Sequence, residues 1–342
     1  MKKTVFARLR STAAVLPLGL LASVALTSPT RAAVEHTSLA QTPAIMAFLA
    51  AYIAEDAGIW RDNELDVKVI NLPGVTTVNA VIAGSSDFAL AASDSLTRAA
   101  AHGQKLLAIG ALNNQSGQMT VLRKEIAEAE HFNPNAPLAE RMKILRGKNM
   151  AGGAVGSVAD VFLKVLAHDG GLTERDFTIS SIGAFDLMAA FSRKAIDGVS
   201  YSLPYPQQLV ADGSAVVIAD GTRSEPADLM PLAAGLVLTR PQLCKDQRSV
   251  CEKMGHSLVQ ATKFLLERKD ESLAILTKRF PQISEGVVRS SYEAVARMTL
   301  SPPAVSEVAL HNGDKMNDQA GMLKAEDKVS SYDGLFTNEF LK

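Results

Sequence analysis

The spacing of hydrophobic positions switches repeatedly along this chain between the period of strands and the period of helices. Short apolar or alternating runs predict strands, and apolar positions three and four residues apart predict helices. In the first part of the chain, strands are predicted at 37–40, 65–72, 87–91 and 106–112, and helices at 43–58, 76–83 and 93–103. Strands that alternate with helices favour an α/β fold with a mostly parallel sheet, in which ligand-binding groups lie at the carboxyl ends of the strands.

The same alternation begins again further along the chain. Strands are predicted at 150–151, 177–182, 198–201 and 216–219, with helices starting after Ser157, at 185–194 and near Pro204. Beyond residue 240 the apolar spacing is helical, and Pro302-Pro303 separates the last two helices. The chain therefore contains two α/β units followed by a helical region.

Two apolar stretches of similar pattern flank the second unit. They read MTVLR at 119–123 and GLVLT at 235–239. We interpret them as paired crossing strands between two lobes, which makes the second lobe an insertion in the first. The alternative is that they are unrelated edge strands. The predicted organisation is a signal peptide at 1–32, lobe I at 33–117 and 235–342 with the C-terminal helices, and lobe II at 118–234.

The N-terminal residues have the layout of a secretory signal peptide. Basic residues at positions 2, 3, 8 and 10 precede an uncharged run at 11–26, and Thr30-Arg31-Ala32 provides small residues for cleavage after Ala32 or Ala33. The alternative is a membrane anchor. The run is shorter than the roughly 20 apolar residues that span a bilayer, and Pro17 and Gly19 interrupt it. We therefore expect export to the periplasm.

Composition narrows the possible partners. The 342 residues are 47% hydrophobic and 21% charged, with a formal net charge of -1 and interspersed acids and bases. A balanced charge gives no attraction for nucleic acid or a membrane surface, and 5% aromatic residues are few for stacking on bases. These values predict a folded protein with no nucleic-acid partner. We also expect a small-molecule ligand and a monomeric state.

The two cysteines, Cys244 and Cys251, stand seven residues apart in LCKDQRSVC. An oxidising compartment would let them form a disulfide, and such a short loop would stabilise the fold by about 2 to 3 kcal/mol. The competing interpretation is a metal or redox site. That interpretation lacks a CxxC motif or a neighbouring pair of histidines, so we expect a local structural bond.

The stretch KNMAGGAVGSVADVFLKV at 148–165 predicts a strand, a glycine turn and a helix start. Ser157 suits the N-cap of the helix, and Asp160 three residues later completes a capping box. Free backbone N–H groups at Gly156, Ser157 and Val158 would then point, with the positive end of the helix dipole, at an anionic or hydrogen-bond-accepting group. The alternative is a capped helix that binds nothing. Neither GxGxxG nor GxxxxGK[ST] is present, which argues against a nucleotide.

Three more helix starts carry a hydroxyl side chain, at Thr42, Ser93 and Ser202. With Ser157 they would give two such starts from each lobe, and together these could hold a carboxylate or a sulfonate. Gln41 and Asn113 stand at strand ends and could add amide contacts. The remaining candidate residues each allow two interpretations.

Tyr201 and Tyr205 either form an aromatic wall of the site or belong to the core. Asp94 either faces the cleft, which would favour a cationic ligand, or caps its own helix. We favour the cap for Asp94. No HExxH or GxSxG motif accompanies the scattered histidines, so no catalytic residue, metal site or cofactor is predicted.

Several segments, taken in order, resemble one family of exported proteins. They are EDAGIWRDNELDVKVINLPG, AVIAGSSDFALAASDSLTRAAAHGQKLLAIGAL, LRGKNMAGGAVGSVADVFLKVLAHDGGL and AAFSRKAIDGVSYSLPYP. They are similar to segments of the nitrate/sulfonate/taurine family of ABC-transporter solute-binding proteins, including its thiamine-pyrimidine-binding-like members. The matching elements lie at 55–60, 65–70, 84–89, 145–151 and 195–204, and the resemblance covers most of the chain to about residue 239.

The resemblance implies a type II periplasmic-binding-protein fold, in which two α/β lobes close on a ligand. It also implies delivery of that ligand to an ABC-transporter permease, without catalysis and without a cofactor. The expected ligand is a small anion such as a sulfonate, a carboxylate or nitrate, and the alternative is a thiamine-pyrimidine precursor. A thiamine-pyrimidine-synthase-like enzyme of the same fold and an exported ligand-sensing adaptor are further alternatives.

Overall fold

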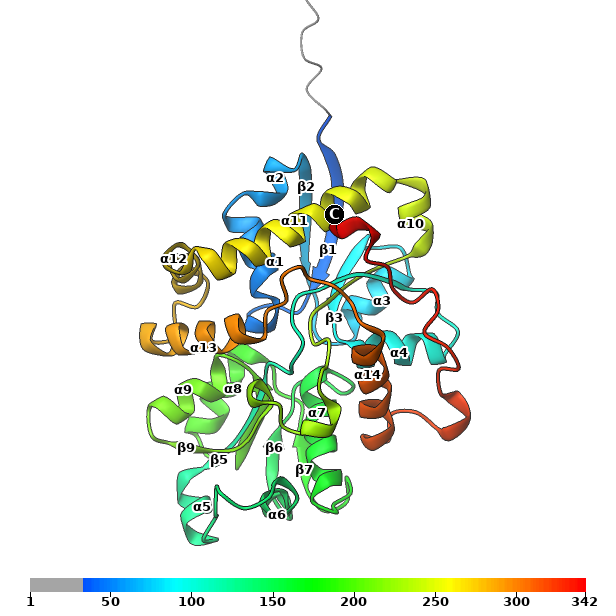
Figure 1. The fold of residues 1–342 in the computed structure, drawn as a ribbon. Coiled ribbons are helices and arrows are strands. Elements are labelled where there is room, and N and C mark those ends of the chain that lie inside the picture. The colour runs from blue at the N-terminus through cyan, green and yellow to red at the C-terminus, as the bar shows by residue number, and fades with distance from the viewer. Residues whose placement is uncertain (1–32) are drawn as a thin grey trace, which may run out of the picture. The chain divides into compact units, whose positions relative to one another are not determined.

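The computed structural model describes residues 33–342, and the predicted signal peptide at 1–32 lies outside the described residues. Residues 34–342 form one compact unit that contains two five-stranded sheets. Figure 1 shows each sheet with the helices that pack on it.

The first sheet has the strand order β2-β1-β3-β10-β4. Its strands are β1 (Glu35–Gln41), β2 (Leu65–Asn71), β3 (Phe88–Ala91), β4 (Leu107–Ala111) and β10 (Leu236–Thr239). β1 pairs in parallel with β2 and β3, whereas β10 runs antiparallel between β3 and β4. The predicted mostly parallel sheet is therefore confirmed.

The second sheet repeats this arrangement with the order β7-β6-β8-β5-β9. Its strands are β5 (Gln118–Arg123), β6 (Asn149–Ala151), β7 (Thr178–Ser180), β8 (Gly198–Ser202) and β9 (Ala215–Asp220). β5 runs antiparallel between β8 and β9, and the other pairs are parallel. Each sheet thus has one antiparallel strand, and in both sheets the chain arrives at that strand from the other sheet.

Helices connect and cover the strands. Those of the first α/β unit are α1 (Leu49–Asp56), α2 (Ile59–Asp62), α3 (Thr76–Ile82) and α4 (Ser93–Ala101). Those of the second are α5 (Lys124–Ala129), α6 (Leu138–Met142), α7 (Val158–Asp169), α8 (Ala184–Ser192) and α9 (Tyr205–Ala211). The C-terminal helices are α10 (Pro241–Asp246), α11 (Arg248–Glu267), α12 (Lys269–Arg279), α13 (Glu285–Met298) and α14 (Glu307–Gln319). Short 3-10 turns lie at Met46–Phe48, Lys143–Leu145, Gly221–Arg223, Ala227–Leu229, Ala325–Asp327 and Glu339–Leu341.

Both faces of the first sheet are buried, because successive residues of a strand point to opposite faces. Leu39 and Leu90 belong to one apolar cluster with residues of α1 and α11, and the adjacent Ala40 and Ala91 belong to a second cluster with residues of α3 and α4. This double burial explains why β3, β4 and β10 read as short, continuously apolar runs in the sequence, whereas β2 at one edge of the sheet alternates between apolar and polar residues.

The chain crosses between the sheets just before the two stretches that the sequence suggested. β5 lies wholly in the second sheet and β10 wholly in the first, so the prediction that MTVLR and GLVLT themselves cross is wrong, and neither is an edge strand. The crossings are 112–117 and 230–235. They lie side by side, since Leu112 N donates to Gly235 O (2.8 Å) and Leu232 N donates to Asn114 O (2.9 Å).

We propose that the lobes divide as the sequence predicts, with lobe I at 33–117 and 235–342 and lobe II at 118–234. The sheet membership of the strands supports these boundaries. Helix α14, from the end of the chain, contacts both α4 of lobe I and α7 of lobe II (Figure 1). The C-terminal helical region is therefore part of both the packing of lobe I and the boundary between the lobes.

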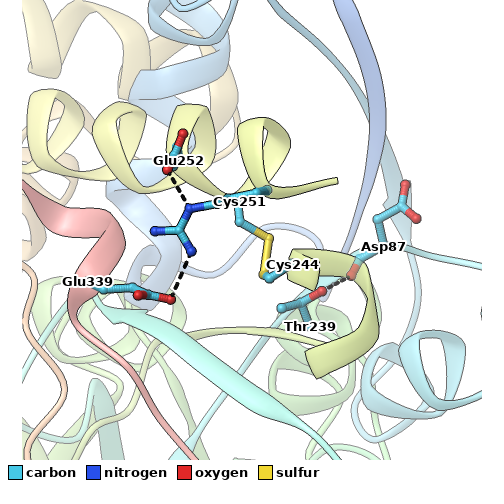
Figure 2. Close-up of a disulfide and its surroundings, with 7 residues drawn as sticks. Asp87, Thr239, Cys244, Cys251, Glu252 and Glu339 are labelled. Carbon is cyan, nitrogen blue, oxygen red and sulfur yellow. Dashed lines mark hydrogen bonds and ion pairs between the residues drawn. A yellow bond between two sulfur atoms is a disulfide. The ribbon is translucent and has the colours of Figure 1, made fainter. Parts of the chain in front are cut away.

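The predicted disulfide is present between Cys244 and Cys251 and links α10 to α11 (Figure 2). Arg248 lies between the two cysteines in sequence and forms ion pairs with Glu252 (2.9 Å) and Glu339 (3.6 Å). The disulfide therefore fixes the corner between α10 and α11, and the Arg248–Glu339 ion pair connects that corner to the C-terminal segment of the chain.

Two local predictions differ from the structure. The helix expected from Pro43 begins at Met46 as a 3-10 turn and becomes α-helical at Leu49. The apolar spacing predicts no helix between the elements at 43–58 and 65–72, but α2 lies there, and Trp60 is 5% exposed. Trp60 is held in the core by helix packing that its polar neighbours in sequence do not reveal.

Candidate functional site

A cavity of about 260 Å³ lies between the two sheets and is lined by residues of both. Lobe I contributes Thr42 after β1, the loop at 73–75 after β2, and Leu90 and Ser95 around the end of β3. Lobe II contributes the turns that follow β6 and β7, together with residues of β5 and β8. This position at strand ends is where parallel α/β sheets bind ligands.

The cavity lining carries no formal charge. None of its lining residues, all within 33–342, is Asp, Glu, Lys, Arg or His. Apolar contact comes from Ile45, Phe48, Val75, Leu90 and Val158. Polar groups come from the hydroxyl residues Thr42, Thr77, Ser95, Ser157, Ser181 and Ser202. Gln118 and Tyr201 add an amide and a phenol, so the cavity suits a compact solute with an apolar body and a few hydrogen-bonding groups.

The turn before α7 has the capping geometry that the sequence predicts. Ser157 is the N-cap of α7, and its hydroxyl accepts a hydrogen bond from Asp160 N (3.4 Å). The Asp160 carboxylate in turn accepts from Gly156 N (2.8 Å), one residue before the usual capping-box partner. Ser157, Val158 and Ala159 line the cavity, so the positive end of α7 lies at its wall.

The opposite wall approaches this turn closely. Gly74 has φ +48°, and a Cβ built on it would lie 3.2 Å from Ser157 Cβ and 3.4 Å from Ala154 Cβ. Only glycine has both the backbone freedom and the small size for this position. The loop at 73–75 of lobe I and the turn at 153–157 of lobe II therefore touch across the cavity.

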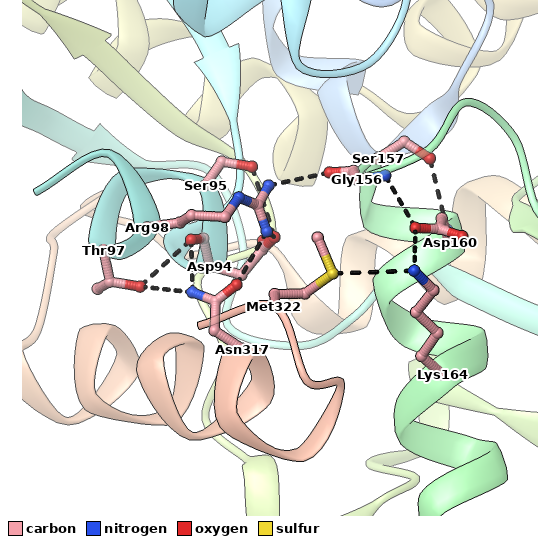
Figure 3. Close-up of polar contacts among 10 residues, drawn as sticks. All are labelled: Asp94, Ser95, Thr97, Arg98, Gly156, Ser157, Asp160, Lys164, Asn317 and Met322. Carbon is pink, nitrogen blue, oxygen red and sulfur yellow. Dashed lines mark hydrogen bonds and ion pairs between the residues drawn. The ribbon is translucent and has the colours of Figure 1, made fainter. Parts of the chain in front are cut away.

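A second link between the lobes is polar (Figure 3). Arg98 on α4 donates through Nη2 to Gly156 O (2.9 Å) and through Nη1 to Asn317 Oδ1 of α14 (2.9 Å). Its Nη1 also lies 3.5 Å from Asp94 Oδ2. Burial raises the pKa of the Asp94 carboxyl, and the positive charge of Arg98 acts in the opposite direction.

The start of α4 reaches the cavity through Ser95, whereas α14 covers the two residues before it. Ser93 is the first residue of the helix rather than its cap, and Ala92 is the cap. Helix α14 packs so closely here that a Cβ on Gly313 would lie 2.5 Å from Ser93 Oγ. Asp94 lies in the first turn of α4, is fully buried and does not line the cavity. The prediction that Ser93 caps the helix at the cavity is therefore wrong, Asp94 does not face the cleft, and Ser95 lines the cavity in their place.

Thr42 and Ser202 line the cavity without capping a helix. Thr42 precedes a bend, and Ile45 is the N-cap of the following 3-10 turn. Ser202 is the last residue of β8, and Pro204 is the N-cap of α9. Of the predicted helix starts, the one at Ser157 is thus the one with a capping hydroxyl. The structure nevertheless brings Thr42, Ser157, Val158 and Ser202 together around one cavity.

The remaining predicted residues lie near the cavity but not on its wall. Asn113 is 1% exposed, and its side chain donates to Ala47 O (3.0 Å) and accepts from Ala234 N (3.1 Å), which ties the crossings together. Gly156 has φ +73° and stands behind the turn that Ser157 completes. Gln41 is buried and lines a separate groove with Phe185 and Arg279.

Tyr205 belongs to the core, at 1% exposure, with its ring edge-on to Tyr201 at 6.0 Å between centroids. Tyr201 lines the cavity, and burial raises the pKa of its phenol. The core reading of Tyr205 therefore describes its position, and the aromatic wall that the sequence suggested is formed by its neighbour.

Gln118 and Thr77 were not predicted. Thr77 lies within α3, whose apolar spacing gave no sign of a cavity. Gln118 begins β5 directly opposite Ser202 in the antiparallel register. A polar residue at the start of an otherwise apolar strand that follows a crossing was the available signal for Gln118.

Within residues 33–342, no helix is long and apolar enough to cross a membrane. The same residues contain no group of three or more His, Cys, Asp or Glu side chains placed to hold a metal ion.

Comparison with known proteins gives one family and many structural likenesses. A family model described as NMT1/THI5 like matches residues 46–272. The comparison with curated protein sequences gave no match. A solved structure from Bordetella bronchiseptica RB50 aligns with a TM-score of 0.76 and 18% identity, over 90% of this chain and 95% of that chain.

Two further solved structures carry informative names. The alkanesulfonate-binding protein SsuA from Xanthomonas axonopodis pv. citri, bound to MOPS, aligns with a TM-score of 0.67 and 19% identity, over 86% of this chain and 96% of that chain. The periplasmic nitrate-binding protein NrtA from Synechocystis PCC 6803 aligns with a TM-score of 0.68 and 16% identity, over 90% of this chain and 87% of that chain. At these identities the likeness concerns the fold, and it confirms the predicted bilobal periplasmic-binding-protein architecture.

Proposed function

Because the chain belongs to the NMT1/THI5-like family, we propose that it is a solute-binding protein without catalytic activity, which encloses a small organic anion between its lobes. We further propose that it works as a monomer in the periplasm and delivers the solute to the permease of an ABC importer. Structural relatives named for binding alkanesulfonate and nitrate support this assignment. The disulfide supports an oxidising compartment.

The observation that carries the proposal is a cavity whose walls come from both lobes, with the capped end of α7 on one wall. Backbone N–H groups at a helix N-terminus attract negative charge, and each such interaction contributes about 0.3 to 1 kcal/mol in exposed settings. The attraction grows where water is excluded. Ser157 N already donates to Ala154 O (2.9 Å) within the turn. An anionic head group would therefore lie at the Ser157 hydroxyl and at Val158, with the body of the solute against Phe48, Val75 and Leu90.

The apolar part of the lining favours an organic anion over nitrate. Nitrate has no apolar surface to bury against these side chains, whereas a sulfonate or carboxylate with a short carbon chain or ring does. Ser202 Oγ and Gln118 Oε1 are buried and have no hydrogen-bond partner among the described residues. Leaving such groups unpaired costs free energy, so a polar substituent of the solute that reached them would add affinity.

A neutral heteroaromatic solute, such as a thiamine-pyrimidine precursor, is the second candidate. The uncharged lining and the presence of Tyr201 and Gln118 favour it, because an amide and an aromatic ring recognise such a molecule without a formal charge. The enzyme alternative, a protein like the thiamine-pyrimidine synthases, would use a cysteine cluster near its active site. Cys244 and Cys251 are bonded to each other and line no part of the cavity, which supports binding without catalysis.

A thermal-shift screen of the protein without its signal peptide tests the proposal. The panel contains alkanesulfonates, carboxylates, aromatic acids, nitrate and thiamine pyrimidines. A ligand at 100 times its dissociation constant stabilises the folded state by about 2.7 kcal/mol, a visible shift in melting temperature. We expect an organic anion to give the largest shift. A pyrimidine as the strongest ligand would overturn the choice of anion, and no response from any compound would overturn the proposed solute classes.

Ser157→Asp then tests the site by calorimetry with the best anion. Aspartate is also a good N-cap, so the melting temperature should change little, while its charge should abolish anion binding. Ser306→Asp is the matched control, because Ser306 caps α14 through Ala309 N (3.3 Å) and does not line the cavity. Unchanged affinity in Ser157→Asp would place the anion elsewhere.

A further inference from the structure

Arg98 is fixed within lobe I by groups on two helices. Its side chain is 14% exposed and bonds Asn317 Oδ1 of α14 (2.9 Å), with Asp94 Oδ2 of α4 at 3.5 Å. Asn317 is itself held, because its Nδ2 donates to Asp94 O (2.7 Å) and to Thr97 Oγ1 (3.1 Å). Three neighbouring residues of lobe I therefore set the direction in which the guanidinium points (Figure 3).

The free end of this guanidinium reaches lobe II. Arg98 Nη2 donates to Gly156 O (2.9 Å), and Gly156 N donates to Asp160 Oδ2 (2.8 Å). Gly156 is thus held on both sides, by lobe I through its carbonyl and by α7 through its N–H. The next residue is Ser157, which caps α7 and lines the cavity. The position of this wall of the cavity therefore depends on Arg98.

The bond exists only while the lobes are together. The turn at 153–157 rests on the loop at 73–75, where a Cβ on Gly156 would lie 3.4 Å from Val75 Cγ1. A separation of the lobes by a few ångström would break the Arg98–Gly156 hydrogen bond, since such bonds weaken sharply beyond about 3.5 Å. The same movement would open the cavity between Gly74 and Ser157.

Other bonds between the lobes are weaker candidates for this role. Met46 N to Leu203 O (2.9 Å) and Ser284 N to Gln208 Oε1 (3.0 Å) join neutral groups. The Lys315–Asp228 ion pair is charged, but its side chains are 38% and 50% exposed, and exposed pairs contribute little. Arg98 combines a charge, burial and a fixed direction, and hydrogen bonds to charged groups are about twice as strong as neutral ones.

We propose that Arg98 is a positioning residue that holds the two lobes closed and fixes the Ser157 turn, and that it thereby sets how long a solute stays bound without touching it. The ligand part of this proposal rests on the proposed function, whereas the closure part does not. Loss of one charge-assisted hydrogen bond in the closed state should speed solute release by about tenfold or more.

The experiment compares Arg98→Met and Arg98→Lys with Arg141→Lys. Arg141 is a matched control, since it is 10% exposed and also bonds a carbonyl, Ile218 O (2.7 Å), and a carboxylate, Glu225, but entirely within lobe II. Two measurements need no ligand. Hydrogen exchange reports on the amides of 153–158, and the distance between spin labels, one on each lobe, reports on closure. A third measurement is the dissociation rate of the best ligand from the screen.

For Arg98→Met we expect faster exchange at 153–158, a longer label distance and faster ligand release. For Arg98→Lys we expect the same changes in smaller measure, because an ammonium keeps the charge but not the fork geometry. Arg141→Lys should lower the melting temperature and leave all three readouts unchanged. If Arg98→Met does not fold, the three measurements on Arg98→Lys test the proposal instead.

Exchange and label distance equal to wild type in the Arg98 variants would overturn the proposal. The same is true of equal changes in Arg141→Lys, because they would show a general loss of stability. If no compound binds the wild type, the proposed function fails, and the two ligand-free readouts still decide the role of Arg98 in closure.

Discussion

Asp94 is a carboxyl group with no solvent exposure, and its Oδ1 has no hydrogen-bond partner among the described residues. Burial disfavours its charged form and raises its pKa above the ordinary value of 3.8. The folded state therefore holds the proton more tightly than the unfolded state does. The stability that this gives is complete below the unfolded pKa and is lost as the pH rises through the folded pKa.

Asp94→Asn should remove this dependence. The amide oxygen can still accept from Arg98, and no carboxylate charge is buried at this position at any pH. We expect the free energy of unfolding of the variant, relative to wild type, to increase as the pH rises from about 4 to about 8. Urea unfolding at several pH values measures it. A constant difference between the two proteins across this range would contradict the expected direction.

Gly74 is the residue at which backbone conformation and lobe contact coincide. Gly74→Ala would strain a positive φ and press a methyl group against Ser157 Cβ, at 3.2 Å. We expect weaker ligand binding, because the loop at 73–75 can no longer meet the turn of lobe II. Isothermal calorimetry measures the change.

The control for this variant is Gly171→Ala. Gly171 has φ +68° and nothing within 4 Å of the added Cβ, so it shares the strain without the contact. Both variants should lose about 1 kcal/mol of stability from the backbone alone. Equal ligand affinities in the two variants would show that the contact across the cavity does not matter.

At the scale of elements, the disulfide is the covalent link between two helices. Replacing both Cys244 and Cys251 with Ala should lower the free energy of unfolding by about 2 to 3 kcal/mol, since the closed loop is short. Ligand affinity should stay the same, because neither cysteine lines the cavity. Chemical unfolding and calorimetry of the double variant check both parts. A loss of affinity would mean that the α10–α11 corner influences the cavity.

The sequence predicts helices and strands well where nearby residues determine which side chains are buried. It predicts them poorly where a segment far away in the sequence covers them. Most strands of both sheets were found because each is a short run of apolar or alternating residues. The roles of Ser93 and Asp94 were missed because α14, more than two hundred residues later in the chain, covers the start of α4. The helix start predicted at Thr42 is wrong for another reason. The chain bends at 42–44 before it becomes helical at Met46.

At the scale of the whole molecule, two lobes and a cavity between them follow from the alternation of strands and helices and from the family resemblance. The cavity itself could be predicted only in part. Thr42 and Ser157 follow strands, and Ser202 is the last residue of one. Their sequence position alone therefore places them at the strand ends that face the cavity. Gln118, Thr77 and the Arg98–Gly156 bond depend on how two sheets meet, and no local pattern encodes that.

The pair of crossing segments has a mechanical consequence. Asn113 bonds both Ala47 O and Ala234 N, and the segments at 112–117 and 230–235 bond each other directly. Two short chains fastened in this way bend together more easily than they slide or twist. Relative movement of the lobes should therefore be confined to nearly one degree of freedom. Uptake and release of a solute should then be the closing and opening directions of one hinge motion.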